Sequence, residues 1–218
     1  MTVPKGQFFL LLSLTLALSG CASWSMWSSN QHAPAQRVAG LIERGEQQWT
    51  MRACGQEQSR LLQPTEELER LFDNIGQSGQ QSIFAELEIS EKGGRWVVNK
   101  THRLESTDRG CMGAGEAASQ WVGFSRAEGW RVDITTQGML LTTKDGEDGR
   151  QVSMISEQMP NGTLGFRGEY DQGLELWLYP TGCIDRSTGD YYHLNAVLMR
   201  DGQRFQGCGY QGGQPTQF

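Results

Sequence analysis

The chain has 218 residues, with 25 acidic and 19 basic side chains and a net charge of −6. A chain this acidic, without a basic patch, is poorly suited to bind nucleic acid or an anionic lipid surface. Glycine is abundant, with 28 residues, and only one stretch has a clear helical pattern, so many short strands joined by tight turns are expected. These features predict a mainly β protein with two small antiparallel β-barrel or sandwich domains, the first carrying one amphipathic helix.

Residues 1–20 have the pattern of a secretory signal peptide. One cation, Lys5, precedes an unbroken run of apolar residues, serine and threonine over 8–18, which is too short to span a bilayer. The Leu-Ser-Gly-Cys sequence at 18–21 resembles the bacterial lipobox. This resemblance implies cleavage before Cys21 and acylation of its thiol and amine. The alternative is an ordinary signal peptide that happens to end at a cysteine.

Lipidation at Cys21 would determine where in the cell the protein is located. Two or three acyl chains, at about 0.8 kcal/mol per buried methylene, anchor a protein far more firmly than a single chain. In enterobacterial lipoproteins an aspartate after the lipidated cysteine favours inner-membrane retention, and this chain has Ala22 there. The resemblance therefore implies an outer-membrane anchor with the protein facing the periplasm. Residues 21–36, rich in serine, alanine and polar side chains, are interpreted as a lipidated, flexible tether.

Four further cysteines form an even set in a chain with an export signal, which is typical of structural disulfides. Three pairings of Cys54, Cys111, Cys183 and Cys208 are open on sequence grounds. Pairing within each half, Cys54 with Cys111 and Cys183 with Cys208, is favoured because it matches the division of the chain into two halves. A metal site or a redox pair is disfavoured because the spacings contain no Cys-x-x-Cys and fit no zinc ribbon.

The first domain is expected over residues 37–116. Strand patterns at 38–43 and 48–54 flank a Gly-Glu turn, which predicts a hairpin. Alternating apolar residues at 83–89 predict a half-buried strand. Between them, a proline and an acidic first turn precede apolar residues at helical spacing, which predicts one amphipathic helix carrying Leu68, Leu71, Phe72 and Ile75.

The second domain is expected over residues 117–213, followed by a tail at 214–218. Repeated X-Gly turns separate strand-like runs, which indicates an antiparallel meander closing into a barrel or sandwich. Roughly eight strands suit a barrel that fills its own interior with side chains. The runs lie at 121–125, 130–135, 139–143, 151–155, 163–170, 174–179, 193–200 and 204–208.

The C-terminal half resembles a family of uncharacterised Gram-negative outer-membrane lipoproteins. Their final domain carries Cys-x-Asp-x-(Met or Ser)-(Ser or Thr)-Gly and ends in Gly-Cys. Here Cys183, Asp185, Ser187 and Gly189 match the first motif, and Cys208 matches the second. More distantly, the segment is similar to META-domain proteins related to HslJ. The resemblance covers about residues 121–210 and implies a small β fold in the cell envelope, without an assigned reaction.

Candidate chemistry is sparse. Cys183, Asp185, Ser187 and His193 lie close in sequence, and a nucleophile, a base and an orienting group could be assembled from them. The alternative is an oxidised cysteine, a loop in which the polar side chains bond to the backbone, and a histidine that opens a strand. The second interpretation is preferred. No pair of histidines has metal-ligand spacing on a helix, so we expect no metal site. With the loop interpretation preferred for residues 183–193, we also expect no catalytic residue and no cofactor.

Aromatic residues offer a clue to binding. Trp130 and Trp177 are expected in the core, because aromatic side chains dominate β cores. Tyr191 and Tyr192 follow a segment rich in Gly, Asp and Ser, so at least one of them is expected to be exposed. These two tyrosines and Asp185 are the predicted partner-contact residues.

The function expected from the sequence is that of a non-enzymatic accessory or interaction module. It would be held at the membrane by its N-terminal lipid, with an envelope protein or a cell-wall component as partner and no nucleic acid. An alternative is a periplasmic inhibitor or ligand-binding lipoprotein that resembles lipid-anchored lysozyme inhibitors, since an acidic body would be steered onto a basic enzyme. An envelope hydrolase using residues 183–193 is the third hypothesis.

Overall fold

The computed structural model describes residues 34–76, 80, 82–113, 119–144, 149, 151–170 and 173–213. Residues Ala33–Phe218 form one compact unit, called the body below. Both disulfides and both sheets lie within the body, so the bonds that join its strands and its two halves are all internal to it. The predicted signal peptide, Cys21, most of the tether and the tail lie outside the described residues.

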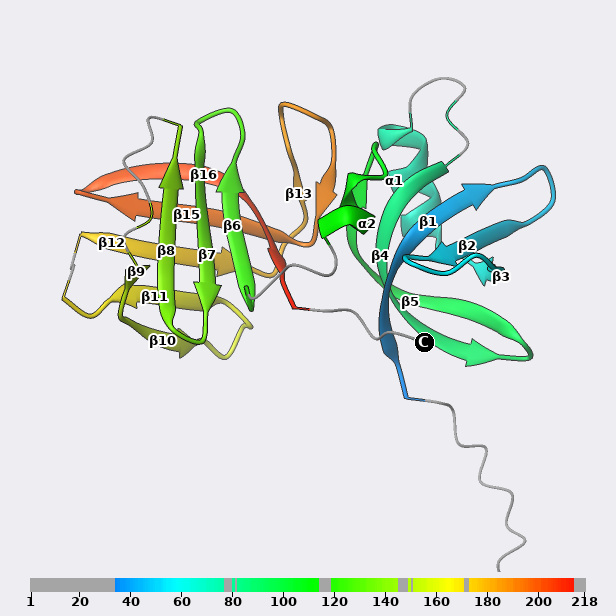
Figure 1. The fold of residues 1–218 in the computed structure, drawn as a ribbon, viewed down its shortest axis with the longest axis horizontal. Coiled ribbons are helices and arrows are strands. Elements are labelled where there is room, and N and C mark those ends of the chain that lie inside the picture. Colours follow the sequence, from blue (N-terminus) through cyan, green and yellow to red (C-terminus); the bar gives the residue numbers. More distant parts are fainter. Residues whose placement is uncertain are drawn as a thin grey trace, which may run out of the picture. The chain divides into compact units, whose positions relative to one another are not determined.

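The first sheet closes into a five-stranded barrel (Figure 1). The ring order is β1-β2-β3-β5-β4, with β4 also paired to β1, and all pairs are antiparallel except β3–β5. Helix α1 connects β3 to β4. This connectivity is that of a Greek-key barrel of the OB-fold kind. The elements are β1 (Gln36–Arg44), β2 (Trp49–Ala53), β3 (Ser59–Gln63), α1 (Glu66–Ile75), β4 (Ser82–Lys92), β5 (Arg95–Glu105) and α2 (Arg109–Gly113).

Helix α1 forms as the sequence predicts. The Thr65 hydroxyl accepts a hydrogen bond from the Leu68 amide at 3.2 Å, which caps the helix start, and acidic side chains occupy the first turn, where the helix dipole favours them. The predicted apolar face is buried, and Phe72 makes an edge contact with Trp49 at 4.8 Å between ring centres. The helix therefore covers the core of the first barrel with the side chains Leu68, Leu71, Phe72 and Ile75.

Strand β4 differs from the prediction, because both of its faces are buried at its start. Ile83 and Ala85 point into the barrel core, as the alternation predicts, but Phe84 on the other face is also fully buried. Helix α2 covers Phe84: a Cβ placed on Gly110 would lie 2.4 Å from its ring. The sequence predicted neither α2 nor β3, because both are too short to show a periodic pattern.

The second sheet is an antiparallel meander, ordered β10-β11-β12-β15-β16-β6-β7-β8-β9. Only Ser153 separates β9, paired with β8, from β10, paired with β11, so this run closes the meander into an eight-stranded ring. In Figure 1 the arrows of β6, β7 and β8 cross those of β12, β15 and β16 behind them. The strands are β6 (Trp121–Ser125), β7 (Trp130–Thr135), β8 (Gly138–Thr143), β9 (Gln151–Val152), β10 (Met154–Gln158), β11 (Leu164–Gly168), β12 (Leu174–Tyr179), β15 (Leu194–Arg200) and β16 (Gln203–Gln211).

The two tryptophans expected in the core of the second barrel lie on different faces. Trp130 is buried in that core, as predicted. Trp177 is a correction: it alternates with buried Leu176 and Leu178, so it lies on the outer face of β12 and is only partly covered. Its indole rests on Gly165 of the neighbouring strand, where a Cβ would come within 2.7 Å of the ring.

A hairpin inserted between β12 and β15 links the two barrels. Its strands, β13 (Cys183–Ile184) and β14 (Tyr191–Tyr192), join the first sheet through β5 rather than the second, although the sequence division assigned them to the second half. Both predicted disulfides are confirmed. The Cys54–Cys111 bridge closes the first half, and the Cys183–Cys208 bridge fastens β13 to β16. The segment from Cys183 to Tyr192 is called the strap below.

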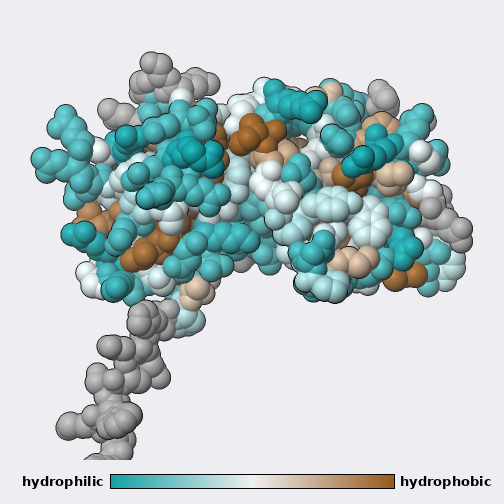
Figure 2. Space-filling view, turned by 180° about the vertical axis from the view of Figure 1, so that it is seen from behind, coloured by the Kyte–Doolittle hydropathy of each residue, from teal (hydrophilic) through white to brown (hydrophobic). Residues whose placement is uncertain are grey.

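The surface of the body is mainly hydrophilic on the face shown in Figure 2, where hydrophobic side chains appear in small separate groups. Such scattered apolar residues are ordinary for a water-exposed surface. Among the described residues, no helix has the length and apolar character needed to cross a membrane.

Candidate functional site

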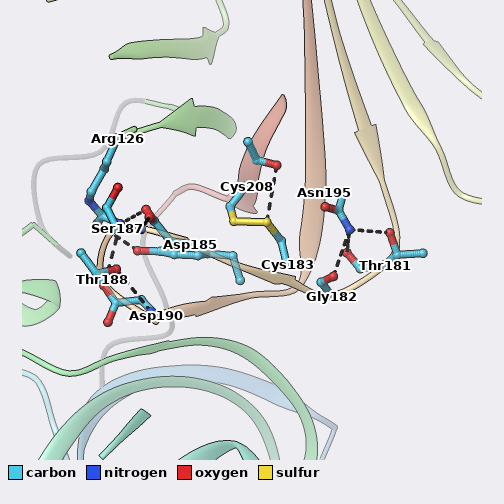
Figure 3. The surroundings of a disulfide bond; sticks show 12 residues. Arg126, Thr181, Gly182, Cys183, Asp185, Ser187, Thr188, Asp190, Asn195 and Cys208 are labelled. Atoms are coloured by element: carbon cyan, nitrogen blue, oxygen red, sulfur yellow. Dashed lines mark hydrogen bonds and ion pairs between the residues drawn. A yellow bond between two sulfur atoms is a disulfide. The ribbon is translucent and has the colours of Figure 1, made fainter. Parts of the chain in front are cut away.

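The strap is shaped by its own polar side chains (Figure 3). One carboxylate oxygen of Asp185 accepts the Ser187 amide at 2.7 Å, and the Asp185 carbonyl accepts the Gly189 amide at 2.8 Å. Gly189 has a φ of +79°, a conformation that glycine adopts without strain. This is the turn chemistry that Asp and Gly favour, and it brings β13 and β14 side by side.

Hydrogen bonds fix the strap to the first barrel. Tyr192 pairs with Arg103 of β5, and the next amide, from His193, donates to the His102 carbonyl at 2.9 Å. One carboxylate oxygen of Asp190 accepts the Ser106 amide at 2.9 Å. The strap therefore extends the first sheet by backbone pairing, while the Cys183–Cys208 bridge holds it to the second.

Arg126 reaches the strap from the turn between β6 and β7. Its guanidinium donates to Asp185 at 2.5 Å and to the Tyr192 hydroxyl at 3.0 Å, and lies 3.8 Å from Asp190. Burial alone lowers the pKa of Arg126, but Tyr192 and Asp185 raise it above its ordinary value. Arg126 is therefore a permanent cation that joins the second barrel to the strap.

A buried hydroxyl continues this network into the first barrel. Tyr192 is fully buried, and its hydroxyl donates to Glu105 of β5 at 2.9 Å. Burial raises the pKa of the Tyr192 phenol far above its usual range, and the Glu105 charge raises it further. Tyr192 therefore stays protonated, accepting from Arg126 while donating to Glu105.

Two further arginines lie where the barrels meet. Arg37 of β1 donates to Glu86 of β4 and to the carbonyls of Gln211 and Gly212 at the end of β16. The guanidinium of Arg103 lies over the Tyr210 ring at 4.6 Å, and over the Phe84 ring at 4.7 Å. The junction is thus bound by charge-assisted hydrogen bonds and cation–π contacts, which are among the stronger polar interactions in proteins.

The structure corrects the expectation that at least one of Tyr191 and Tyr192 is exposed, on which their predicted role as partner contacts, together with Asp185, depended. Their exposed fractions are 9%, 0% and 6%. The loop composition suggested exposure, but pairing of the strap with β5 buries both tyrosines and places Asp185 against Arg126. These residues hold the barrels together instead of presenting a surface.

The candidate catalytic residues have separate structural partners. Cys183 is oxidised in the disulfide, Asp185 bonds to Arg126 and to its own turn, and the His193 Nδ1 lies 3.1 Å from the His102 carbonyl. Within the described residues, no group of three His, Cys, Asp or Glu side chains is placed to hold a metal ion.

His102 and His193 form a buried pair with ring centres 4.7 Å apart. Burial lowers the pKa of His102 to about 3, with a further contribution from His193, and lowers the pKa of His193 to about 4, with a further contribution from Lys100. Both rings are therefore neutral at physiological pH. No sequence spacing connects the two histidines, because 91 positions divide them.

Two cavities flank Arg126. One, of about 410 Å³, lies beside the disulfide and is lined by polar residues that include Asp185, Arg186 and Arg204. The other, of about 460 Å³, is called the aromatic cavity. Both volumes suit a small ligand. The aromatic cavity is lined by Glu105, Phe124, Ser125, Arg126, Gly129, Trp130, Arg131, Thr142, Thr143, Lys144, Tyr192 and Tyr210.

Sequence reasoning missed most of this junction. Arg126, Glu105 and Tyr210 stand in ordinary turn or strand contexts, and no spacing connects them. Only the strap motif from Cys183 to Gly189 pointed to the region, through the family resemblance.

No family model, curated protein or solved structure matches this chain. The resemblance to outer-membrane lipoproteins therefore stays a prediction from the quoted motifs.

Proposed function

We propose that this protein is a lipid-anchored cell-envelope protein that faces the periplasm from the outer membrane and acts as a non-enzymatic accessory or interaction module. One observation supports this cellular location. The four cysteines of the body pair with one another, so that Cys21 is the only one of the five cysteines without a disulfide partner in the body. Paired body cysteines are typical of proteins from oxidising compartments. A remaining cysteine after Leu-Ser-Gly is suited to acylation.

The construction of the body supports an interaction role. Strap, disulfide and arginine contacts join two small barrels, each of which alone would bury a modest core. Cys183, a candidate nucleophile of the sequence, is oxidised in the disulfide. A cross-linked scaffold of this kind presents a fixed surface to a partner, whether an envelope protein or a cell-wall component, with little conformational cost on binding.

The address is tested by membrane fractionation of cells that produce the full chain, the Cys21→Ser variant or the Ala22→Asp variant. We expect the full chain in the outer-membrane fraction and Cys21→Ser chain unprocessed, without lipid. The Ala22→Asp chain should move to the inner membrane in an enterobacterial host. Full chain in the soluble periplasmic fraction, or unchanged processing of Cys21→Ser, would refute the anchor.

A second candidate function, inhibition of a basic cell-wall hydrolase such as lysozyme, is favoured by the net charge of −6 and a pI near 5.1. Opposite charge would speed encounter with a basic enzyme at low salt. The assay is lysozyme activity in the presence of the purified body, and no inhibition at micromolar protein rejects this candidate.

A further inference from the structure

The aromatic cavity lies where the second barrel, the strap and the first barrel meet. Its lining comes from β6 and the turn after it, from β7 and β8, from Tyr192 of the strap, from Tyr210 of β16 and from Glu105 of β5. The strap and the disulfide fix these elements against each other, so the cavity is largely preformed. A preformed cavity loses little conformational entropy when it binds a ligand.

The floor of the cavity is aromatic. Phe124 and Tyr192 meet edge to face with ring centres 4.9 Å apart, and Tyr210 lies 5.7 Å from Tyr192. Phe124 and Trp130 are buried, while Tyr210 is partly exposed. The guanidinium of Arg126 lies over the Phe124 ring at 4.9 Å and that of Arg103 over the Tyr210 ring at 4.6 Å. The aromatic surface that these two cations leave open is where the body of an organic ligand, especially a flat one, can lie.

The rim is rich in donors and poor in acceptors. Arg126, Arg131 and Lys144 line the cavity, against Glu105 as its single carboxylate, and Glu105 already accepts the Tyr192 hydroxyl. The hydroxyls of Ser125, Thr142 and Thr143 add further polar groups. This balance favours an anion, although the whole chain is acidic.

The cations differ in how far they are already neutralised. Arg126 is paired with Asp185, and Arg131 is held in two hydrogen bonds by Asp133, at 2.6 and 2.7 Å. Lys144 is exposed, and within the part of the chain that the structure describes no carboxylate lies at ion-pair distance from it. Among the described residues, Lys144 is thus the rim cation that no carboxylate neutralises, and its single charge matches a ligand with one negative charge.

We propose that the aromatic cavity binds a small organic carboxylate with an aromatic body, whose ring lies on Phe124 and Tyr210 and whose carboxylate meets Lys144. The ring would replace water on the aromatic floor, and the carboxylate would gain a charged hydrogen bond at a partly dehydrated rim. The site lies in the body and does not depend on the lipid anchor.

The test uses the purified body, Ala33–Phe218, with 2-naphthoate as the probe and 2-naphthamide as the uncharged probe of the same shape. Binding is measured by calorimetry and by amide chemical shifts in nuclear magnetic resonance spectra. Lys144→Gln removes the rim cation. Lys92→Gln is the matched control, since this exposed lysine sits at the far end of the β4–β5 hairpin, about ten residues along β5 from the cavity residue Glu105.

We expect naphthoate to shift amides of residues 124–131 and 142–144, and to bind roughly five- to tenfold more tightly than the amide, as one charged hydrogen bond predicts. Lys144→Gln should abolish this preference, with Lys92→Gln unchanged. Equal affinity for the two probes, equal effects of the two lysine variants, or no shifts at the cavity at millimolar probe would each overturn the proposal. Such a failure would leave the fractionation test of the anchor untouched.

Discussion

The Tyr192 hydroxyl is the point at which three parts of the body meet. It accepts from Arg126 of the second barrel, belongs to the strap and donates to Glu105 of the first barrel. A buried carboxylate that loses its donor keeps the full cost of its desolvation, which makes such a hydroxyl more important than an average hydrogen bond.

Replacing Tyr192 with Phe should therefore destabilise the body by about 1–3 kcal/mol, because Glu105 remains buried without its hydroxyl donor. Urea unfolding at pH 7 measures the change. Tyr170→Phe makes the same chemical change at a residue that is 84% exposed and should alter stability very little. Equal effects of the two variants would mean that the buried network contributes nothing.

The neutral pair of His102 and His193 predicts a loss of stability in acid. The folded-state pKa of each ring lies below its ordinary value of 6.5, so the stabilisation is complete above pH 6.5 and is lost as pH falls toward 4 and 3. Lys100 and Arg37 oppose protonation of both rings, whereas Glu88, 3.8 Å from His102, favours it there.

Replacing His193 with Asn removes one titrating ring while retaining a donor for the His102 carbonyl. Between pH 8 and pH 5 the wild-type body should lose about 2 kcal/mol more stability than the variant, the amount a pKa near 4 implies. Denaturant unfolding at the two pH values gives both differences. Parallel losses would show that His193 does not titrate in this way.

Among the elements, the strap depends most on a covalent bond. The chain-entropy model assigns each disulfide about 3–4 kcal/mol, given separations of 25 residues for Cys183–Cys208 and 57 for Cys54–Cys111. Their local effects on the strap should differ, because only the Cys183–Cys208 bridge holds β13 to β16.

A double Cys183→Ala, Cys208→Ala variant should therefore lower hydrogen-exchange protection at the amides of Tyr192 and His193 more than a double Cys54→Ala, Cys111→Ala variant does. The exchange is compared at equal global stability, set with denaturant. If the strap amides are protected equally in both variants, pairing with β5 holds the strap without the bridge.

Trp130 and Trp177 lie on opposite faces of the second barrel wall, one in the core and one outside. Trp130→Ala should lower the free energy of unfolding by about 3–5 kcal/mol, because its ring fills the core of the second barrel. Trp177→Ala should lower it clearly less, because its ring lies on the outer surface over Gly165. Thermal or urea unfolding of the two variants decides, and equal costs would contradict the assignment of faces.

Elements with local signatures could be predicted. Thr65 and the acids after it signal the start of α1, and X-Gly turns separate most strands of the second barrel. The even number of cysteines indicated disulfides, and the division of the chain into two halves led to the right pairing. The strap pairing could not be predicted, since Tyr192 and Glu105 are 87 positions apart and two-residue strands show no periodicity. Trp177 was misplaced because composition alone cannot tell which face of a strand is buried.

For the whole molecule, the proposed anchor and the aromatic cavity are independent features. The first rests on residues 1–21, which lie outside the described residues, together with the pairing of every cysteine in the body. The second rests on the geometry of the barrel junction. The anchor decides where the protein acts.

The most direct test is mass spectrometry of the N-terminal tryptic peptide from protein purified out of the membrane fraction. A lipid anchor at Cys21 predicts a peptide that begins at Cys21, ends at Arg37 and carries a diacylglyceryl group on the thiol, with or without an acyl chain on the amine. A peptide that retains residues before Cys21, or that begins at an unmodified Cys21 or at a later residue, would contradict it.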